Sequence, residues 1–321
     1  MQAITLCAIL IATIFSDVPL HAAGFTPAAG PAAGQAEHVV LFVLEGLDQP
    51  ALKAGPMPVL SRLVKDGSVT WSAEAASPFV RLPAMASLLT GLPVSKHGIT
   101  WDSFEFSRGY PRPPTLFDYL DLSGGRDSAI FLMDESLYQL AKPEPYTDYQ
   151  LCGPLKPECT PRRLVAYIKQ YFAKAASGHG YGHAILAFPH LLVVHLPAPE
   201  RAGQAQGWSS NEYRQALRSV DQAMGDVLDL YRSHGLLERT AIAVTSLSGP
   251  ATSRAAGVPW IVSGYGIKSG YAIRGPVSLI DTGATVMRIM GLETHAEWDS
   301  RPVEEIFVGA SIGRVAMRKE R

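Results

Sequence analysis

Continuous apolar runs alternate with amphipathic segments along most of the chain. Residues 39–44 (VVLFVL) are apolar throughout and residues 191–196 (LLVVHL) are apolar except for His195, without the polar alternation of a strand that has one face in water. Such runs are typical of parallel strands that helices cover on both faces. Residues 161–176 and 210–234 instead place their apolar residues at helical spacing. The pattern predicts an α/β/α sandwich with a largely parallel central sheet.

Further segments fit the same alternation. We expect helices at 58–67, 82–89 and 280–290, and strands at 128–132, 240–245 and 260–263. Residues 134–161 have the least periodic pattern, so we expect a surface insertion there. Ligands of open α/β sheets bind beyond the carboxyl ends of the strands. The site is therefore expected where residues follow strands or open a helix: Glu45-Gly46, the loop before Leu82-Pro83, Pro199-Glu200 and Leu247-Ser248.

The amino-terminal segment is typical of an export signal. Residues 3–15 (AITLCAILIATIF) form an apolar run of thirteen residues, whereas a bilayer span needs about 20. The small residues Ala22 and Ala23 follow, as at a cleavage site. No Lys or Arg precedes the run, and the alternative is an uncleaved hydrophobic anchor. We expect a signal peptide at 1–23 and a periplasmic or secreted protein with no stable membrane span after cleavage.

Composition and charge narrow the class of protein. The 321 residues are 47% hydrophobic and 18% charged, which suits one sizeable globular domain rather than a disordered chain. The formal net charge of -1 offers no polybasic surface, so we expect no nucleic-acid partner. A leader rich in Ala, Gly and Pro is expected at 24–36, followed by the domain at 37–310 and a tail at 311–321.

Two cysteines remain once the signal is removed. Cys152 and Cys159 lie in a Pro-rich segment (LCGPLKPECTP). In an oxidising compartment such a pair favours one short disulfide. The alternative is half of a metal site, but no His or second Cys pair lies close by in the sequence.

Several motifs resemble a known family. The stretches VVLFVLEGLD, MPVLSRLVKDG and VRLPAMASLLTGLPVSKHGI are followed in order by GVPWIVSGYGI and SLIDTGATVMRIMGLE. Over about residues 37–307 the chain resembles the type I phosphodiesterase/nucleotide pyrophosphatase group of the alkaline phosphatase superfamily. The resemblance implies an alkaline-phosphatase-like domain and two-metal phosphoryl transfer. In that chemistry three Asp and three His hold two zinc-type ions, and a Thr or Ser attacks phosphorus.

The positions that the resemblance assigns to this chemistry carry other residues. The first metal-binding Asp corresponds to Glu45, and the nucleophile corresponds to Arg81, which stays protonated and cannot attack. The D-x-x-x-H pair corresponds to Glu200 and Gln204.

The remaining ligand positions differ as well. The Asp-His after the strand AIAVTS corresponds to Leu247 and Ser248, and residues 250–259 contain no His before the GVP phrase. Leucine cannot bind a metal. All six ligand positions therefore depart from the pattern of the family.

These replacements predict a pseudoenzyme with a binding or accessory role and no metal cofactor. Its ligand is expected to be a small anion or a periplasmic protein. The alternative is an active metal-dependent phosphodiesterase or phosphatase-type hydrolase with an atypical site for Zn, Mg or Mn, built on Glu45 and Glu200 with help from Asp48, Asp102 or His97. The residues expected to line the cleft are Glu45, Arg81, Asp102, Glu200, Gln204 and His97.

Three roles are open for Arg81. Its guanidinium can pair with Glu45, with Glu200 close by, and so replace the cationic charge of the metals. It can instead bind an anionic ligand such as phosphate or sulfate, or lie on a solvated loop. A Ser77 or Ser87 nucleophile with His97 as base is a further alternative, which the absence of a G-x-S-x-G elbow disfavours.

Overall fold

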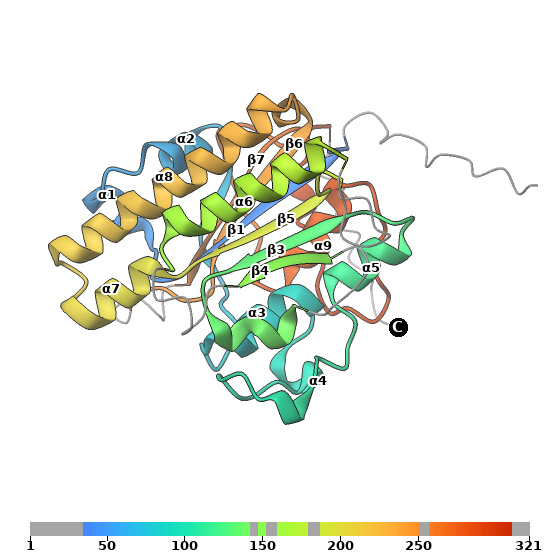
Figure 1. The fold of residues 1–321 in the computed structure, drawn as a ribbon, viewed down its shortest axis with the longest axis horizontal. Coiled ribbons are helices and arrows are strands. Elements are labelled where there is room, and N and C mark those ends of the chain that lie inside the picture. Colours follow the sequence, from blue (N-terminus) through green and yellow to red (C-terminus); the bar gives the residue numbers. More distant parts are fainter. Residues whose placement is uncertain (1–34, 142–146, 152–158, 179–186, 251–256, 310–321) are drawn as a thin grey trace, which may run out of the picture. The chain divides into compact units, whose positions relative to one another are not determined.

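The computed structural model describes residues 35–141, 147–151, 159–178, 187–250 and 257–309. Within these ranges, eight strands form one sheet in the order β4-β3-β5-β1-β6-β7-β2-β8 (Figure 1). The strands are β1 (His38–Leu44), β2 (Gly67–Ala73), β3 (Ser128–Leu132), β4 (Thr147–Leu151), β5 (Leu191–Leu196), β6 (Thr240–Ser246), β7 (Val258–Gly264) and β8 (Tyr271–Ala272).

The sheet is mostly parallel. The ladder from β4 through β3, β5 and β1 to β6 is parallel, whereas β7 runs antiparallel to both β6 and β2. Every residue of β1, β5 and β6 is buried, as their continuous apolar runs predict. Side chains of β1 alternate between two cores: Val39, Leu41 and Val43 face one, and Val40, Phe42 and Leu44 face the other.

Helices cover both faces of the sheet, which confirms the predicted α/β sandwich. The core on one face includes residues of α2, α6 and α8, and the core on the other includes residues of α3, α5 and α9 (Figure 1). The helices are α1 (Gln49–Ala54), α2 (Pro58–Lys65), α3 (Arg81–Thr90), α4 (Val94–His97), α5 (Leu116–Leu122), α6 (Pro161–Ala176), α7 (Ala198–Gln206), α8 (Asn211–Ser233) and α9 (Asp281–Ile289). Short 3₁₀ turns include η1 (Phe106–Arg108), η2 (Glu135–Leu140), η3 (Leu237–Arg239) and η5 (Glu304–Ile306).

The structure adds elements that the sequence pattern did not predict. Part of the segment expected to be a surface insertion forms β4, which pairs with β3 at the edge of the sheet. The polar helix α7 follows β5 directly, and its Gly203 leaves room for Trp208, because a Cβ there would lie 2.3 Å from the indole. Both elements are short and polar, so in neither do apolar residues recur at a clear strand or helix spacing.

Several predictions fall outside the described residues. The signal peptide, nearly all of the leader, and the tail from residue 310 on lie outside these ranges, as does Cys152. Export and the Cys152–Cys159 disulfide therefore stay predictions. Within the described ranges, no helix is both long enough and apolar enough to cross a bilayer.

Candidate functional site

Residues at the carboxyl ends of the central strands meet around one small hollow. Glu45 follows β1, Glu200 lies in the first turn of α7 after β5, and Ser248 follows β6. Together with Arg81, the first residue of α3, they line a hollow of about 220 Å³. The topology thus brings together four of the positions at which the sequence predicted a site.

Gly46 allows these segments to approach each other. Its φ is +75°, and a Cβ at this position would lie 2.7 Å from the backbone of Glu200. A left-handed conformation and a contact this short both favour glycine. The glycine after β1 therefore lets the first turn of α7 lie directly against Glu45.

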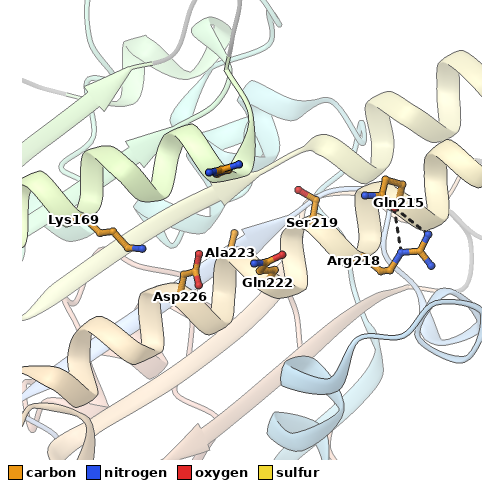
Figure 2. A pocket seen from close by; sticks show the side chains of 8 residues that line it. Lys169, Gln215, Arg218, Ser219, Gln222, Ala223 and Asp226 are labelled. Carbon is orange, nitrogen blue, oxygen red and sulfur yellow. Dashed lines mark hydrogen bonds between the residues drawn. The ribbon is translucent and has the colours of Figure 1, made fainter.

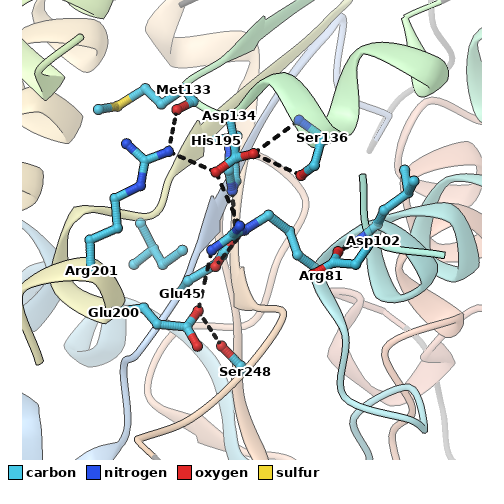
Figure 3. A network of polar contacts seen from close by, with 12 residues as sticks. Glu45, Arg81, Asp102, Met133, Asp134, Ser136, His195, Glu200, Arg201 and Ser248 are labelled. Atoms are coloured by element: carbon cyan, nitrogen blue, oxygen red, sulfur yellow. Dashed lines mark hydrogen bonds and ion pairs between the residues drawn. The ribbon is translucent and has the colours of Figure 1, made fainter. Parts of the chain in front are cut away.

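The guanidinium of Arg81 lies among three carboxyl groups (Figure 3). Its Nε donates to both carboxylate oxygens of Glu45, at 2.7 and 2.9 Å. Nη1 lies 3.0 Å from Asp134 Oδ2, and Nη2 lies 4.0 Å from Glu200 Oε2. The Arg81 side chain is 21% exposed and that of Glu45 is 1% exposed. The structure therefore contains the predicted Arg81–Glu45 pair, and the solvated-loop hypothesis is wrong.

Two members of this network were not predicted from the sequence as site residues. His195 Nε2 lies 2.6 Å from Glu45 Oε1, and the His195 side chain is completely buried. Asp134 accepts a hydrogen bond from Arg201 Nη2 at 2.7 Å and another from Ser136 Oγ at 2.7 Å. His195 is the single polar residue of its apolar strand, which was a usable signal. Asp134 follows the predicted strand at residues 128–132, so its place beyond a strand end was also a usable signal.

Glu200 is held by neutral donors. Gln204 Nε2 donates to Glu200 Oε1 at 2.9 Å, and Ser248 Oγ donates to Oε2 at 2.8 Å. Burial, reinforced by the hydrogen bond and negative charge of Glu45, raises the pKa of Glu200 to about 8. At neutral pH its carboxyl group is therefore mostly protonated.

Glu45 behaves in the opposite way. Burial alone would raise its pKa, but hydrogen bonds to His195 and Glu200 and the charge of Arg81 hold the pKa well below its usual range. The pKa of Asp134 is also lowered, because the charge of Arg81 and the bonds from Ser136 and Arg201 outweigh its burial. Two carboxylates thus face two guanidinium groups.

Of the two other predicted cleft residues, the structure brings only Asp102 to the hollow. Its Oδ1 accepts the backbone N–H of Leu82 at 2.8 Å, at the start of α3. His97 does not line the hollow, because it is buried against Ser87, with 2.9 Å between Nε2 and Ser87 Oγ. Its Nδ1 accepts the Ile99 N–H at 3.1 Å, so Nε2 carries the proton in the neutral ring.

This tautomer argues against the serine hypothesis. A general base must accept the proton of the nucleophile, but the Nε2 of neutral His97 already carries a proton. Burial lowers the pKa of His97 to about 4, which keeps the ring neutral at pH 7. Ser87 itself is completely buried, out of reach of a substrate.

The residues present do not fit the two zinc-type ions of the family's chemistry. The carboxylate oxygens of Glu45 already bind Arg81 and His195, and those of Glu200 accept from Gln204 and Ser248. Leu247 is apolar and 1% exposed. Within the described ranges, no group of three or more His, Cys, Asp or Glu residues is arranged to hold a metal ion.

Comparisons with solved structures show which proteins share this fold. Murine ectonucleotide pyrophosphatase/phosphodiesterase 5, as an inactive variant in complex with AMP, superposes with a TM-score of 0.63 at 12% identity, covering 85% of this chain and 100% of that chain. A Bacteroides thetaiotaomicron protein linked to the metabolism of multiple glycosaminoglycans gives a TM-score of 0.65 at 14% identity, over 87% of this chain and 78% of that one.

A third structure, solved with its substrate D-glucosamine-2-N,6-O-disulfate, gives a TM-score of 0.62 at 11% identity, over 85% of this chain and 80% of that one. At these identities the likeness concerns the fold alone. No curated protein matches the chain significantly.

The sequence itself identifies the family. The family model described as type I phosphodiesterase/nucleotide pyrophosphatase matches residues 39–254, about two thirds of the chain. The matched region runs from β1 to beyond β6 and so includes the strand ends that form the hollow. The chain belongs to the type I phosphodiesterase/nucleotide pyrophosphatase family of the alkaline phosphatase superfamily.

Proposed function

We propose that this protein is an exported, catalytically inactive member of its family that acts through binding. The observation that carries the proposal is the placement of Arg81 at the centre of the hollow, with each of its three guanidinium nitrogens facing a carboxyl group. In this arrangement the guanidinium of Arg81, a cation fixed to the chain, supplies the positive charge that metal ions supply in the family's chemistry.

The chemistry of the hollow supports inactivity. Metal-assisted phosphoryl transfer needs a nucleophile and a cation that is open to the substrate oxygens. Arg81 stands at the nucleophile position, and the Ser248 hydroxyl donates a hydrogen bond to Glu200. An external phosphate or sulfate would compete with the carboxylates of Glu45 and Asp134 for the guanidinium, so the network also disfavours a small anion at Arg81.

One observation favours a second candidate, an atypical metal-dependent hydrolase. The pKa of Glu200 is raised to about 8 beside the hollow, and perturbed carboxyl groups of this kind also serve as acids or bases. This candidate requires Arg81 to leave Glu45 before a metal ion can bind there. Such a movement would break the contacts with Glu45 at 2.7 Å and with Asp134 at 3.0 Å.

Metal content and hydrolysis, measured together, separate the two candidates. Purified protein is loaded with zinc, manganese and magnesium, desalted, and analysed by plasma mass spectrometry. It is then assayed with bis(p-nitrophenyl) phosphate. The proposal expects less than about a tenth of an equivalent of metal per chain and no hydrolysis above the protein-free rate.

The control variant is Glu45→Ala. One or two equivalents of metal, lost together with hydrolysis in Glu45→Ala, would establish the hydrolase instead. Export is tested by amino-terminal sequencing of the protein recovered outside the cytoplasm, where the proposal expects cleavage after Ala22 or Ala23.

A further inference from the structure

A polar groove lies between α6 and α8, on the outside of the helical layer (Figure 2). Its volume is about 680 Å³, against about 220 Å³ for the hollow at the strand ends. None of the residues lining the groove lines the hollow. The function of the groove is therefore a separate question from that of the network around Arg81.

Helical spacing produces the groove. On α8 the polar lining residues run from Gln215 to Asp226 at spacings of three and four, so they share one face of the helix. On α6, Arg162 and Lys169 stand seven residues apart and border the same space. The floor includes Ala223, whose small buried side chain leaves room above it. The stripe on α8 is about 16 Å long.

The groove carries an excess of positive charge. Arg162, Lys169 and Arg218 line it, against one carboxylate, that of Asp226. In the described part of the chain, none of these three cations belongs to an ion pair. Among the described residues, Arg218 donates to the neutral side chain of Gln215, at 3.1 and 3.3 Å.

The position of Arg162 adds to this charge. It lies in the first turn of α6, where the helix dipole is positive and no acidic residue is present. The side chain and the helix end thus carry charge of the same sign. An anionic group bound here offsets the positive charge of the Arg162 side chain and of the helix end.

We propose that this groove binds an extended acidic segment of a partner protein. Carboxylates of the segment pair with Arg162, Lys169 and Arg218, two of which offer the planar fork that binds carboxylates bidentately. At about 3.3 Å per residue, a groove about 16 Å long accommodates about five residues of extended chain.

The neutral side chains of the groove favour a peptide over a phosphate or sulfate polymer. Gln215 and Gln222 carry both donors and acceptors, as a peptide backbone requires. Asp226 can only accept hydrogen bonds when ionised, so it suits a backbone N–H, a donor that a peptide offers and a polyphosphate chain lacks.

Calorimetric titration with defined probes tests the proposal. The probe is the peptide acetyl-GEDEEG-amide, and acetyl-GQNQQG-amide is its uncharged counterpart. In 50 mM salt we expect the acidic peptide to bind the full chain with a Kd below about 1 mM, and the uncharged peptide not to bind. The Arg162→Glu and Arg218→Glu variants should each weaken binding at least about tenfold.

The matched control is Arg163→Glu, which reverses the charge of the next residue on α6. Arg163 is exposed and does not line the groove, so binding should change by less than about threefold. Thermal melts of all variants check that they fold, and amide exchange should show protection of α6 and α8 by the acidic peptide.

Three results would overturn the proposal. The first is no heat of binding with the acidic peptide. The second is an equal loss of binding in Arg163→Glu and Arg162→Glu. The third is tripolyphosphate binding that depends on Arg162 and Arg218 and is tighter than binding of the peptide, which would assign the groove to phosphate polymers.

Discussion

Replacing Arg81 with alanine removes the cation on which three carboxyl groups converge. The variant leaves Glu45, which is 1% exposed, without its counter-ion. Removing one partner of a buried ion pair destabilises a protein by about 3–5 kcal/mol, because the remaining charge stays in a poorly solvated place. For a domain of this size each kcal/mol lowers the Tm by roughly 2–4 °C. We therefore expect Arg81→Ala to melt about 6–20 °C below the wild type.

A double-mutant cycle shows whether this loss comes from the pair. Glu45→Gln alone removes the negative charge and leaves the guanidinium with Asp134 and Glu200. The double variant Glu45→Gln/Arg81→Ala removes both charges, so its unfolding free energy should exceed the value expected from adding the two single losses. We expect a coupling energy of about 2–3 kcal/mol.

Scanning calorimetry and urea unfolding at pH 7 measure these values. Arg201→Ala is the matched control, because Arg201 also contacts Asp134 but is 42% exposed, and its loss should be about 1 kcal/mol or less. Millimolar guanidinium chloride should raise the Tm of Arg81→Ala and leave that of the wild type unchanged. A melting loss below about 2 °C in Arg81→Ala, or an additive cycle, would refute the idea that a tethered cation holds this site together.

Three further predictions concern other parts of the structure. Burial lowers the pKa of His97 from 6.5 to about 4. Below pH 6.5 the unfolded chain therefore binds a proton at His97 that the folded protein does not, and the free energy of unfolding falls as the pH drops from 6.5 toward 4. Between pH 7 and pH 5, the loss of unfolding free energy measured with urea should be about 2 kcal/mol larger in the wild type than in His97→Gln. His190, whose pKa burial also lowers to about 4, contributes equally to both proteins. Gly46→Ala should destabilise the protein by about 2–4 kcal/mol, because φ is +75° and the new Cβ meets the backbone of Glu200. The control is Gly124→Ala at an exposed position, which also has a positive φ but open space around it, so its loss of unfolding free energy should be smaller. Dialysis against a strong chelator should leave the Tm of the wild type unchanged within about 1 °C, and a larger decrease would indicate a structural metal.

The sequence predicted the central sheet because its strands are buried on both faces. Strands β1, β5 and β6 contain continuous apolar runs, which no exposed segment would carry. β4 (TDYQL) has no such signal, and its place at the sheet edge depends on pairing with β3. The antiparallel direction of β7 is likewise set by its neighbours β6 and β2, which is tertiary information.

The same distinction applies to the site. Glu45, Glu200 and Ser248 follow buried strands, so the rule for open α/β sheets was sufficient to place them together. Asp134 reaches Arg81 only because β3 lies next to β5 in the sheet, and no local pattern reveals this strand order. His195 stands out as the single polar residue of its strand, but a histidine inside an apolar run is usually a packing residue, so it was not assigned to the site.

The geometry also explains why a glutamate suits position 45. Its two oxygens both reach Arg81 Nε, while Oε1 also lies 2.6 Å from His195 Nε2 beneath it. An aspartate would be shorter by one methylene, about 1.5 Å, and would not reach both partners from the same backbone. Glu45 and Arg81 therefore fit each other as a unit. Restoring an aspartate alone at position 45 would shorten the carboxylate while the guanidinium remained, so reversal toward a metal site requires changes at both positions.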